Sequence, residues 1–124
     1  MVFDTGSDWL VVESNACSSC IGKTRYYQSD SYIQLTTDAM SLEYGSASIA
    51  GVTVKDDVCV GSLCSNFEWF LIKAQKGLPS DCSGIIGMSR AGSDEFPSGP
   101  RFFQDQVFSF HLSDQNGPSF VDIG

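Results

Sequence analysis

The chain alternates short apolar runs with turn-forming residues over almost its whole length. The apolar or alternating stretches are separated mainly by Gly, Asp, Asn and Ser, and they occupy residues 2–3, 9–12, 41–44, 46–54, 58–60 and 67–72. Many short strands with turn signals between them are typical of an all-β barrel or sandwich. Helical periodicity is weak, and the one helix that the sequence predicts, at 101–106, is short and follows Pro100.

Composition and charge narrow the class of protein. Hydrophobic residues make up 42% of the 124 and charged residues 18%, which is globular and lacks the signature of disorder. This length is sufficient for one domain but short for two. Seven basic residues against fifteen acidic ones give a net charge of −8, so we expect no nucleic acid as a partner. No run of eighteen apolar residues occurs, so we expect no membrane span.

Both ends of the chain resemble cuts through a domain. Strand-like sequence begins at residue 2 without the segments of a signal peptide, and residues 121–124 still resemble a strand. Residues 90–100 are rich in Gly, Pro and Ser and are typical of a surface loop. We therefore expect one domain of a longer protein, in which Met1 is either native or an added start residue.

Five cysteines indicate an oxidising compartment, in the secretory pathway, in a lysosome or vacuole, or outside the cell. A zinc site built from all four paired cysteines fits common ligand spacings poorly, and a redox-active C-x-x-C lacks a surrounding βαβ pattern. The sequence therefore predicts two short disulfides, Cys17–Cys20 and Cys59–Cys64. Cys82 is then either a buried thiol or the partner of a cysteine outside this chain. We expect no metal and no cofactor.

The stretch VFDTGSDWLVV places a carboxylate in a tight turn between two apolar runs. Gly6 permits a sharp reversal, while Thr5 and Ser7 can hydrogen-bond the nearby backbone or Asp4 itself. An Asp held in this way is partly desolvated and fixed by donors, which suits proton transfer or the activation of water. The alternative is an Asp that only caps a turn, which is common in β proteins.

Several stretches, taken in order, resemble the N-terminal lobe of pepsin-like aspartic proteases. VFDTGSDWLVV is similar to the loop that carries a catalytic Asp, and YGSASIAG at 44–51 is similar to the flap, a hairpin that closes over bound peptide. GIIGM at 84–88 resembles the strand behind that loop. FSFHL and FVDIG, at 108–112 and 120–124, resemble strands at the end of the lobe. The resemblance covers nearly the whole chain.

The resemblance implies that residues 1–124 form an N-terminal lobe, built as a partly closed β-barrel of short strands with one or two short helices. The initial strands and the C-terminal lobe would lie outside this chain. In that family two aspartates, one from each lobe, share a proton and activate a water, the standard example of coupled carboxylates. Asp4 would be one of them, and no other Asp here is followed by Thr-Gly or Ser-Gly.

The second aspartate has two candidate sources. One is the missing C-terminal lobe. The other is a second copy of the chain, as in the retroviral relatives, where identical chains meet across a twofold axis. We favour the missing lobe, because the retroviral chains are shorter and lack the long insertions present here.

The resemblance also implies roles for neighbouring residues. Three would support the catalytic loop, with a hydrogen bond from the last to the outer oxygen of Asp4: Thr5, Gly6 and Ser7. Three in the flap would cover the substrate and pair with it as an added strand: Tyr44, Gly45 and Ser46. Three apolar residues are candidates for the S1 pocket beside the scissile bond, with ordinary core packing as the alternative: Val2, Phe70 and Ile85.

The chain departs from the family pattern at several positions. The Trp that usually follows the catalytic Asp by seven residues, and donates to the flap Tyr, is replaced by Val11, while Trp9 lies two residues earlier. The two positions share a strand face, so either Trp9 takes over this role or Tyr44 lacks its usual partner. The flap Gly is Ala47. His111, the only histidine, has no Ser or Cys nucleophile motif beside it, and we expect a structural role.

Two functions remain open on these grounds. The first is an aspartic endopeptidase that cleaves peptide or protein substrates between bulky apolar residues, with this chain supplying one Asp and inactive by itself. The second is a non-catalytic member of the same fold that binds peptides or serves as an assembly module. The intact D-T-G-S favours the first.

Overall fold

A computed structural model describes residues 1–89 and 107–124 of the chain. The strands in these residues are β1 (Val2–Asp4), β2 (Leu10–Glu13), β3 (Ile33–Gln34), β4 (Met40–Tyr44), β5 (Ala47–Val60), β6 (Leu63–Lys76), β7 (Gly84–Gly87), β8 (Phe108–His111) and β9 (Phe120–Ile123). The all-β class is confirmed. No helix occurs in this part of the chain, so the expected one or two short helices are not found there. Its sequence lacks an apolar stripe of helical period. The helix predicted at 101–106 and the loop at 90–100 lie outside the described residues.

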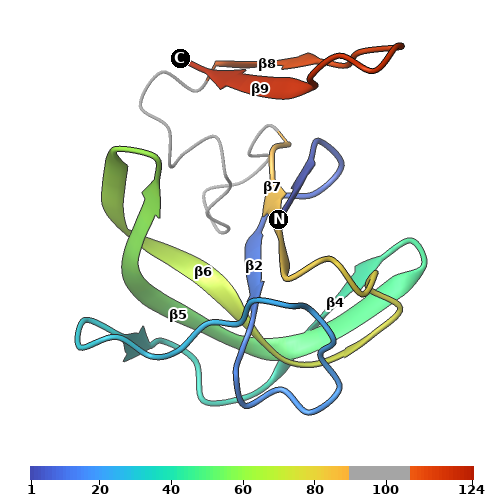
Figure 1. The fold of residues 1–124 in the computed structure, drawn as a ribbon. Coiled ribbons are helices and arrows are strands. Elements are labelled where there is room, and N and C mark those ends of the chain that lie inside the picture. The colour runs from blue at the N-terminus through green and yellow to red at the C-terminus, as the bar shows by residue number, and fades with distance from the viewer. Residues whose placement is uncertain (90–106) are drawn as a thin grey trace.

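Most strands join one open, mixed sheet, in which segments distant in sequence are neighbours (Figure 1). Its order is β1-β7-β2-β6-β5-β3, and β4 pairs with β5. Strand β7 therefore lies between β1 and β2, parallel to the first and antiparallel to the second. The loop that joins β1 to β2 must cross over the end of β7. This topology places the D-T-G-S turn at the C-terminal end of β1, with β7 packed behind it.

Both faces of the central strands are buried, which explains why they are continuous apolar runs. Neighbouring residues on one strand point to opposite faces. In β6, Phe70 and Ile72 belong to one core cluster, while Trp69 and Leu71 belong to the other. The first cluster lies on the side of Trp9, with partly buried flap side chains packed against it.

The two longest strands form one continuous hairpin, which the sequence did not predict. We expected breaks near residues 55–57 and 61–66, but β5 and β6 pair from Ser48 and Lys76 to the two-residue turn between Val60 and Leu63. The polar stretch stays in the strand because buried Asp56 is fully hydrogen-bonded by neighbouring groups. The sequence also failed to predict the edge strand β3. This strand has only two residues, and both are exposed, so it shows no alternation of buried and exposed positions.

The structure contains both predicted disulfides. Cys59 and Cys64 are directly paired near the tip of the β5–β6 hairpin, and the buried Cys17 and Cys20 close a short turn whose two middle residues are exposed. Cys82 is a buried free thiol that donates to the carbonyl oxygen of Gly84 at 3.3 Å. Structural disulfides of this kind fit an oxidising compartment such as the secretory pathway or the cell exterior.

The C-terminal residues form a separate hairpin of β8 and β9 (Figure 1). His111 stacks on Phe120 across this hairpin with ring centroids 4.7 Å apart, in line with a structural role. Phe108 and Ile123 pack against the second core cluster.

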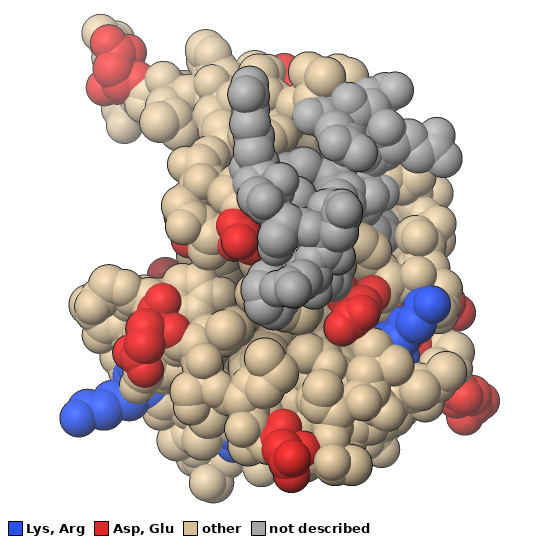
Figure 2. All heavy atoms as spheres, turned by 180° about the vertical axis from the view of Figure 1, so that it is seen from behind, with Lys and Arg blue, Asp and Glu red and all other residues tan. Residues whose placement is uncertain are grey.

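Acidic side chains stand out on the face seen from behind, where basic ones are fewer (Figure 2). This agrees with the net charge of −8. In the residues that the structure describes, no helix has the length and apolar character needed to cross a membrane.

Candidate active site

The Asp4 carboxylate is fixed by its own loop at the end of β1. The backbone N–H of Gly6 donates to Asp4 Oδ1 at 3.0 Å, which closes an Asx turn. A Cβ added at Gly6 would lie 3.3 Å from the same oxygen and would crowd it. Glycine at this position therefore lets the amide approach the carboxylate closely. Thr5, the residue between them, is exposed.

Strand β7 and the two residues that follow it support this loop from behind. Consecutive amides donate to the loop carbonyls: Gly87 N to Trp9 O at 2.8 Å, Met88 N to Asp4 O at 2.7 Å, and Ser89 N to Ser7 O at 3.0 Å. A Cβ at Gly87 would lie 2.6 Å from Ser7 O and Trp9 N, so only glycine permits this approach. The loop is thereby held against a rigid backing, which a catalytic carboxylate requires.

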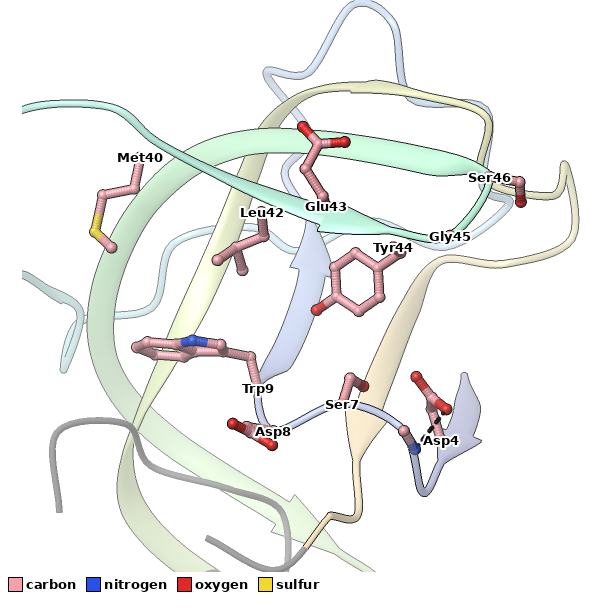
Figure 3. A pocket seen from close by; sticks show the side chains of 11 residues that line it. Asp4, Ser7, Asp8, Trp9, Met40, Leu42, Glu43, Tyr44, Gly45 and Ser46 are labelled. Carbon is pink, nitrogen blue, oxygen red and sulfur yellow. Dashed lines mark hydrogen bonds between the residues drawn. The ribbon is translucent and has the colours of Figure 1, made fainter. Parts of the chain in front are cut away.

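A cavity of about 680 Å³ opens between this loop and the β4–β5 hairpin (Figure 3). The described residues that line it come from these two segments and are Asp4, Gly6, Ser7, Asp8, Trp9, Met40, Leu42, Glu43, Tyr44, Gly45 and Ser46. The D-T-G-S loop and the predicted flap, which are about forty residues apart in sequence, thus face each other across one space.

The hairpin has the form expected of a flap. Tyr44 pairs with Ala47 across a two-residue turn of Gly45 and Ser46, both exposed, and Gly45 has a φ of 36°. Positive φ at the first turn residue is typical of the tight turns that join twisted strands. Side chains along β4 point to opposite faces in turn, so Leu42 and Tyr44 point into the cavity and Glu43, between them, points away (Figure 3).

Two apolar wall residues of the cavity, Met40 and Leu42, were missed by sequence reasoning. Their spacing of two residues, continued by Tyr44, is the signal that could have identified them, because i, i+2 and i+4 share a strand face. Asp8 also lines the cavity and was not singled out.

Tyr44 is half-buried, and its hydroxyl stays protonated over a wide pH range. Burial raises the pKa of Tyr44, and the negative charges of Asp4 and Asp8 raise it further, to about 12. The Ser7 hydroxyl acts in the opposite direction, because it can donate to the phenolate. The Tyr44 hydroxyl is therefore protonated, and able to donate a hydrogen bond, at acid and neutral pH.

The expected hydrogen bond from Ser7 to Asp4 is absent. Ser7 Oγ is buried and makes no hydrogen bond with any residue that the structure describes. It also falls outside hydrogen-bonding geometry with Tyr44, although it is close enough to lower the pKa of that tyrosine. The reason is orientation, since Ser7 lies beneath the flap tyrosine and Asp4 stands further along the loop (Figure 3). Asp4 Oδ1 is held by the Gly6 amide instead.

Trp9, and not Val11, stands next to the flap. Trp9 lines the cavity with Tyr44 and contacts the edge of Phe70, with ring centroids 6.1 Å apart. Val11 is fully buried in the same core cluster, so the two positions share a face, as their spacing predicts.

The three S1 candidates do not line the cavity. Phe70 and Ile85 are buried in the core cluster that includes Trp9, which is the core-packing alternative. Val2 pairs with Ile85 in the β1–β7 ladder and is 45% exposed. The apolar walls come from Trp9 and the flap instead.

Within residues 1–89 and 107–124, no three His, Cys, Asp or Glu side chains gather closely enough to hold a metal ion. The described residues that line the cavity bring carboxylates, a tyrosine hydroxyl, serine hydroxyls, an indole and backbone groups to it.

Comparisons with known proteins agree with this geometry. The family model described as "Eukaryotic aspartyl protease" matches residues 1–124. Vacuolar protease A of Neurospora crassa is 30% identical over 139 residues, covering 100% of this chain and 35% of the relative. Gastricsin of Oryctolagus cuniculus is 35% identical over 132 residues, covering 94% of this chain and 34% of the relative. Pepsin II-1 of the same species is 33% identical, covering 91% and 33%. The chain thus spans about a third of the length of these curated relatives. It belongs to the eukaryotic aspartyl protease family.

Proposed function

We propose that the protein is an aspartic endopeptidase in which Asp4 is one of two carboxylates that activate a water for attack on a peptide bond. The observation that carries this proposal is the position of Asp4. Its carboxylate is fixed by the Gly6 amide, backed by β7, and exposed to a cavity covered by a tyrosine-bearing hairpin.

The chemistry needs two carboxylates that share one proton. The ionised one removes a proton from water, and the protonated one polarises the scissile carbonyl, because like charges at short distance cannot both ionise easily. Asp4 supplies one member of this pair. We propose that a second lobe, outside these 124 residues, supplies the other, and that residues 1–124 alone are inactive.

The flap has two roles in this proposal. The exposed Gly45–Ser46 turn offers backbone groups to an extended peptide, which binds as an added strand. Tyr44 closes the cavity from above and, as a permanent donor, orders the groups around Asp4. The two disulfides, together with the vacuolar relative, support a location in the secretory pathway, in a vacuole-like compartment or outside the cell.

The test is cleavage of a denatured protein at acid pH by the full-length protein. We expect Asp4→Asn to lower kcat by about a hundredfold to ten-thousandfold, because the general base or acid is lost. A statine-type mimic of the tetrahedral intermediate is expected to inhibit the unmodified protein. Asp57→Asn, at an exposed position on the distant part of β5, is the matched control and is expected to keep full activity.

If the full-length protein binds peptides but cleaves none under these conditions, the endopeptidase proposal is wrong, and the non-catalytic peptide-binding function replaces it. Activity that survives Asp4→Asn would contradict the assignment of the carboxylate.

A further inference from the structure

The cavity below the flap combines apolar walls with a carboxylate at its foot. Trp9 and Leu42 both line the space, Leu42 packs on the flap side against the core cluster that contains Trp9, and Asp8 lies below Trp9 on the side away from the flap (Figure 3). A long side chain with an apolar stem and a cationic end matches this arrangement, because its methylenes can pack on the walls while its charge reaches the carboxylate. The indole face of Trp9 adds attraction for a cation.

Asp8 is held in place by groups outside the cavity. The Ser89 hydroxyl donates to Asp8 Oδ1, and the amide of the same serine donates to the neighbouring Ser7 carbonyl at 3.0 Å. A carboxylate fixed in this way loses little side-chain entropy when it binds a cation.

The charge on the described lining is of one sign. Asp4, Asp8 and Glu43 line the cavity, and none of the described lining residues is Lys, Arg or His. The negative potential reaches the flap, since both Asp4 and Asp8 raise the pKa of Tyr44. A cation that enters therefore meets no described positive charge at this site.

We propose that Asp8 is a specificity-determining residue that selects a Lys or Arg side chain in the peptide substrate, with the stem packed along the edge of the Trp9 indole and the charge at Asp8. This inference rests on the proposed function, because it requires the cavity to receive the substrate. This proposal differs from the expectation that only bulky apolar side chains of the substrate are bound. Apolar side chains match the apolar lining of the cavity but leave the Asp8 carboxylate without a partner in the substrate.

Asp8, on the D-T-G-S loop, and Glu43, on flap strand β4, have different roles in this proposal. Glu43 is exposed and points away from the cavity (Figure 3), so solvent screens its effect on a bound side chain. Asp8 is part-buried and lies inside. Glu43→Gln is therefore the matched control for Asp8→Asn, since each variant removes one negative charge from the same lining.

The experiment measures the affinity of the full-length protein for peptides that carry a reduced, uncleavable bond. The peptides are identical except that Lys, norleucine or Glu occupies one of the three positions before that bond. Norleucine has the stem of lysine without its charge. At one position we expect Lys to bind on the order of tenfold more tightly than norleucine, with Glu the weakest. This preference is expected to shrink as salt is raised.

Asp8→Asn is expected to remove the preference for Lys while leaving the affinity for the norleucine peptide unchanged, which also shows that the variant is folded. Asp8→Glu and Glu43→Gln are expected to keep it. The proposal is overturned if no position prefers Lys, if Asp8→Asn leaves the preference intact, or if no peptide binds. Parallel peptides with a normal bond test the proposed function separately. If they bind with the Lys preference but are not cleaved, only the endopeptidase proposal fails.

Discussion

Asp56 allows a direct test of how the free energy of unfolding of this fold depends on pH. It lies in the middle of β5, is only 2% exposed, and accepts hydrogen bonds from the loop before β3 and from its own strand. The donors are the Tyr26 hydroxyl, Ser29 Oγ at 2.6 Å, Ser31 Oγ at 2.5 Å and the Asp57 amide at 2.8 Å. One buried carboxylate therefore ties an irregular loop to the central sheet.

The stability that this carboxylate supplies follows from its pKa. Burial acts to raise the pKa of Asp56, but the hydrogen bonds from Ser29, Ser31, Tyr26 and the Asp57 amide outweigh it and lower the pKa from 3.8 to about 2. This lowering of the pKa corresponds to roughly 2 kcal/mol of stability at neutral pH. Because the folded pKa is depressed, this contribution is complete above about pH 4 and is lost as the pH falls through about 2.

The perturbation is Asp56→Asn, which keeps the shape but removes the charge. Near neutral pH we expect the free energy of unfolding to fall by about 2–4 kcal/mol, because charge-assisted hydrogen bonds to a buried acceptor are lost. Near pH 2 the difference between the two proteins is expected to narrow by roughly 2 kcal/mol, since the native carboxylate is then half protonated or more. Urea unfolding, followed by tryptophan fluorescence, measures both values. Trp69 reports on this region, because its ring lies 4.7 Å from that of Tyr26.

The control is Asp57→Asn. Asp57 is adjacent but exposed, and its side chain accepts one hydrogen bond from Asn66 at 2.9 Å. Its substitution is expected to change stability by no more than about 0.5 kcal/mol. A destabilisation by Asp56→Asn that stays constant from neutral pH to pH 2 would refute the argument, because the hydrogen bonds would then not act through the charge.

Two further substitutions test the packing around the flap. Gly77→Ala is expected to destabilise the protein by at least about 2 kcal/mol and to speed amide exchange in the β4–β5 hairpin. Its φ is 92°, and a Cβ there would run into the backbone of Ser46 and Ala47. Gly61→Ala, with a φ of 61° and open space around the Cβ, is the control, and equal effects of the two would contradict this reasoning. Phe70→Ala is expected to cost about 3–5 kcal/mol in urea unfolding, because the ring is fully buried; a loss below about 1 kcal/mol would show that the core does not depend on it.

The local features of the site could be predicted from sequence because each depends on chemistry within a few residues. The Asx turn at Asp4 needs only a carboxylate two residues before a glycine amide, and that spacing is visible in D-T-G. The flap turn needs glycine between two β-prone runs, which Gly45 supplies. Short-range cysteine pairs likewise close within their own loops.

Other features depend on contacts between distant segments, and the sequence pattern misled on them. The charged stretch at 55–57 resembled a turn because the hydrogen-bond donors to Asp56, Tyr26 and the serines near it, lie 25–30 residues away in the sequence. Phe70 and Ile85 resembled pocket residues because apolar side chains of core and pocket are alike in sequence. Ser7 was expected to bind Asp4, but its orientation is set by the loop that places it beneath Tyr44.

The sequence by itself determined the all-β class, the carboxylate turn, the flap hairpin and both disulfides, because strand propensity, turn chemistry and short loop closures are local. Only the tertiary structure decided which residues share the cavity. The β1-β7-β2 order presses Gly87 against the D-T-G-S loop, and the pairing of β4 with β5 brings Leu42 and Tyr44 over Trp9 and Asp8. The physical reason is that a strand fixes the face on which a side chain lies, whereas the partner across that face is chosen by the register and order of the whole sheet.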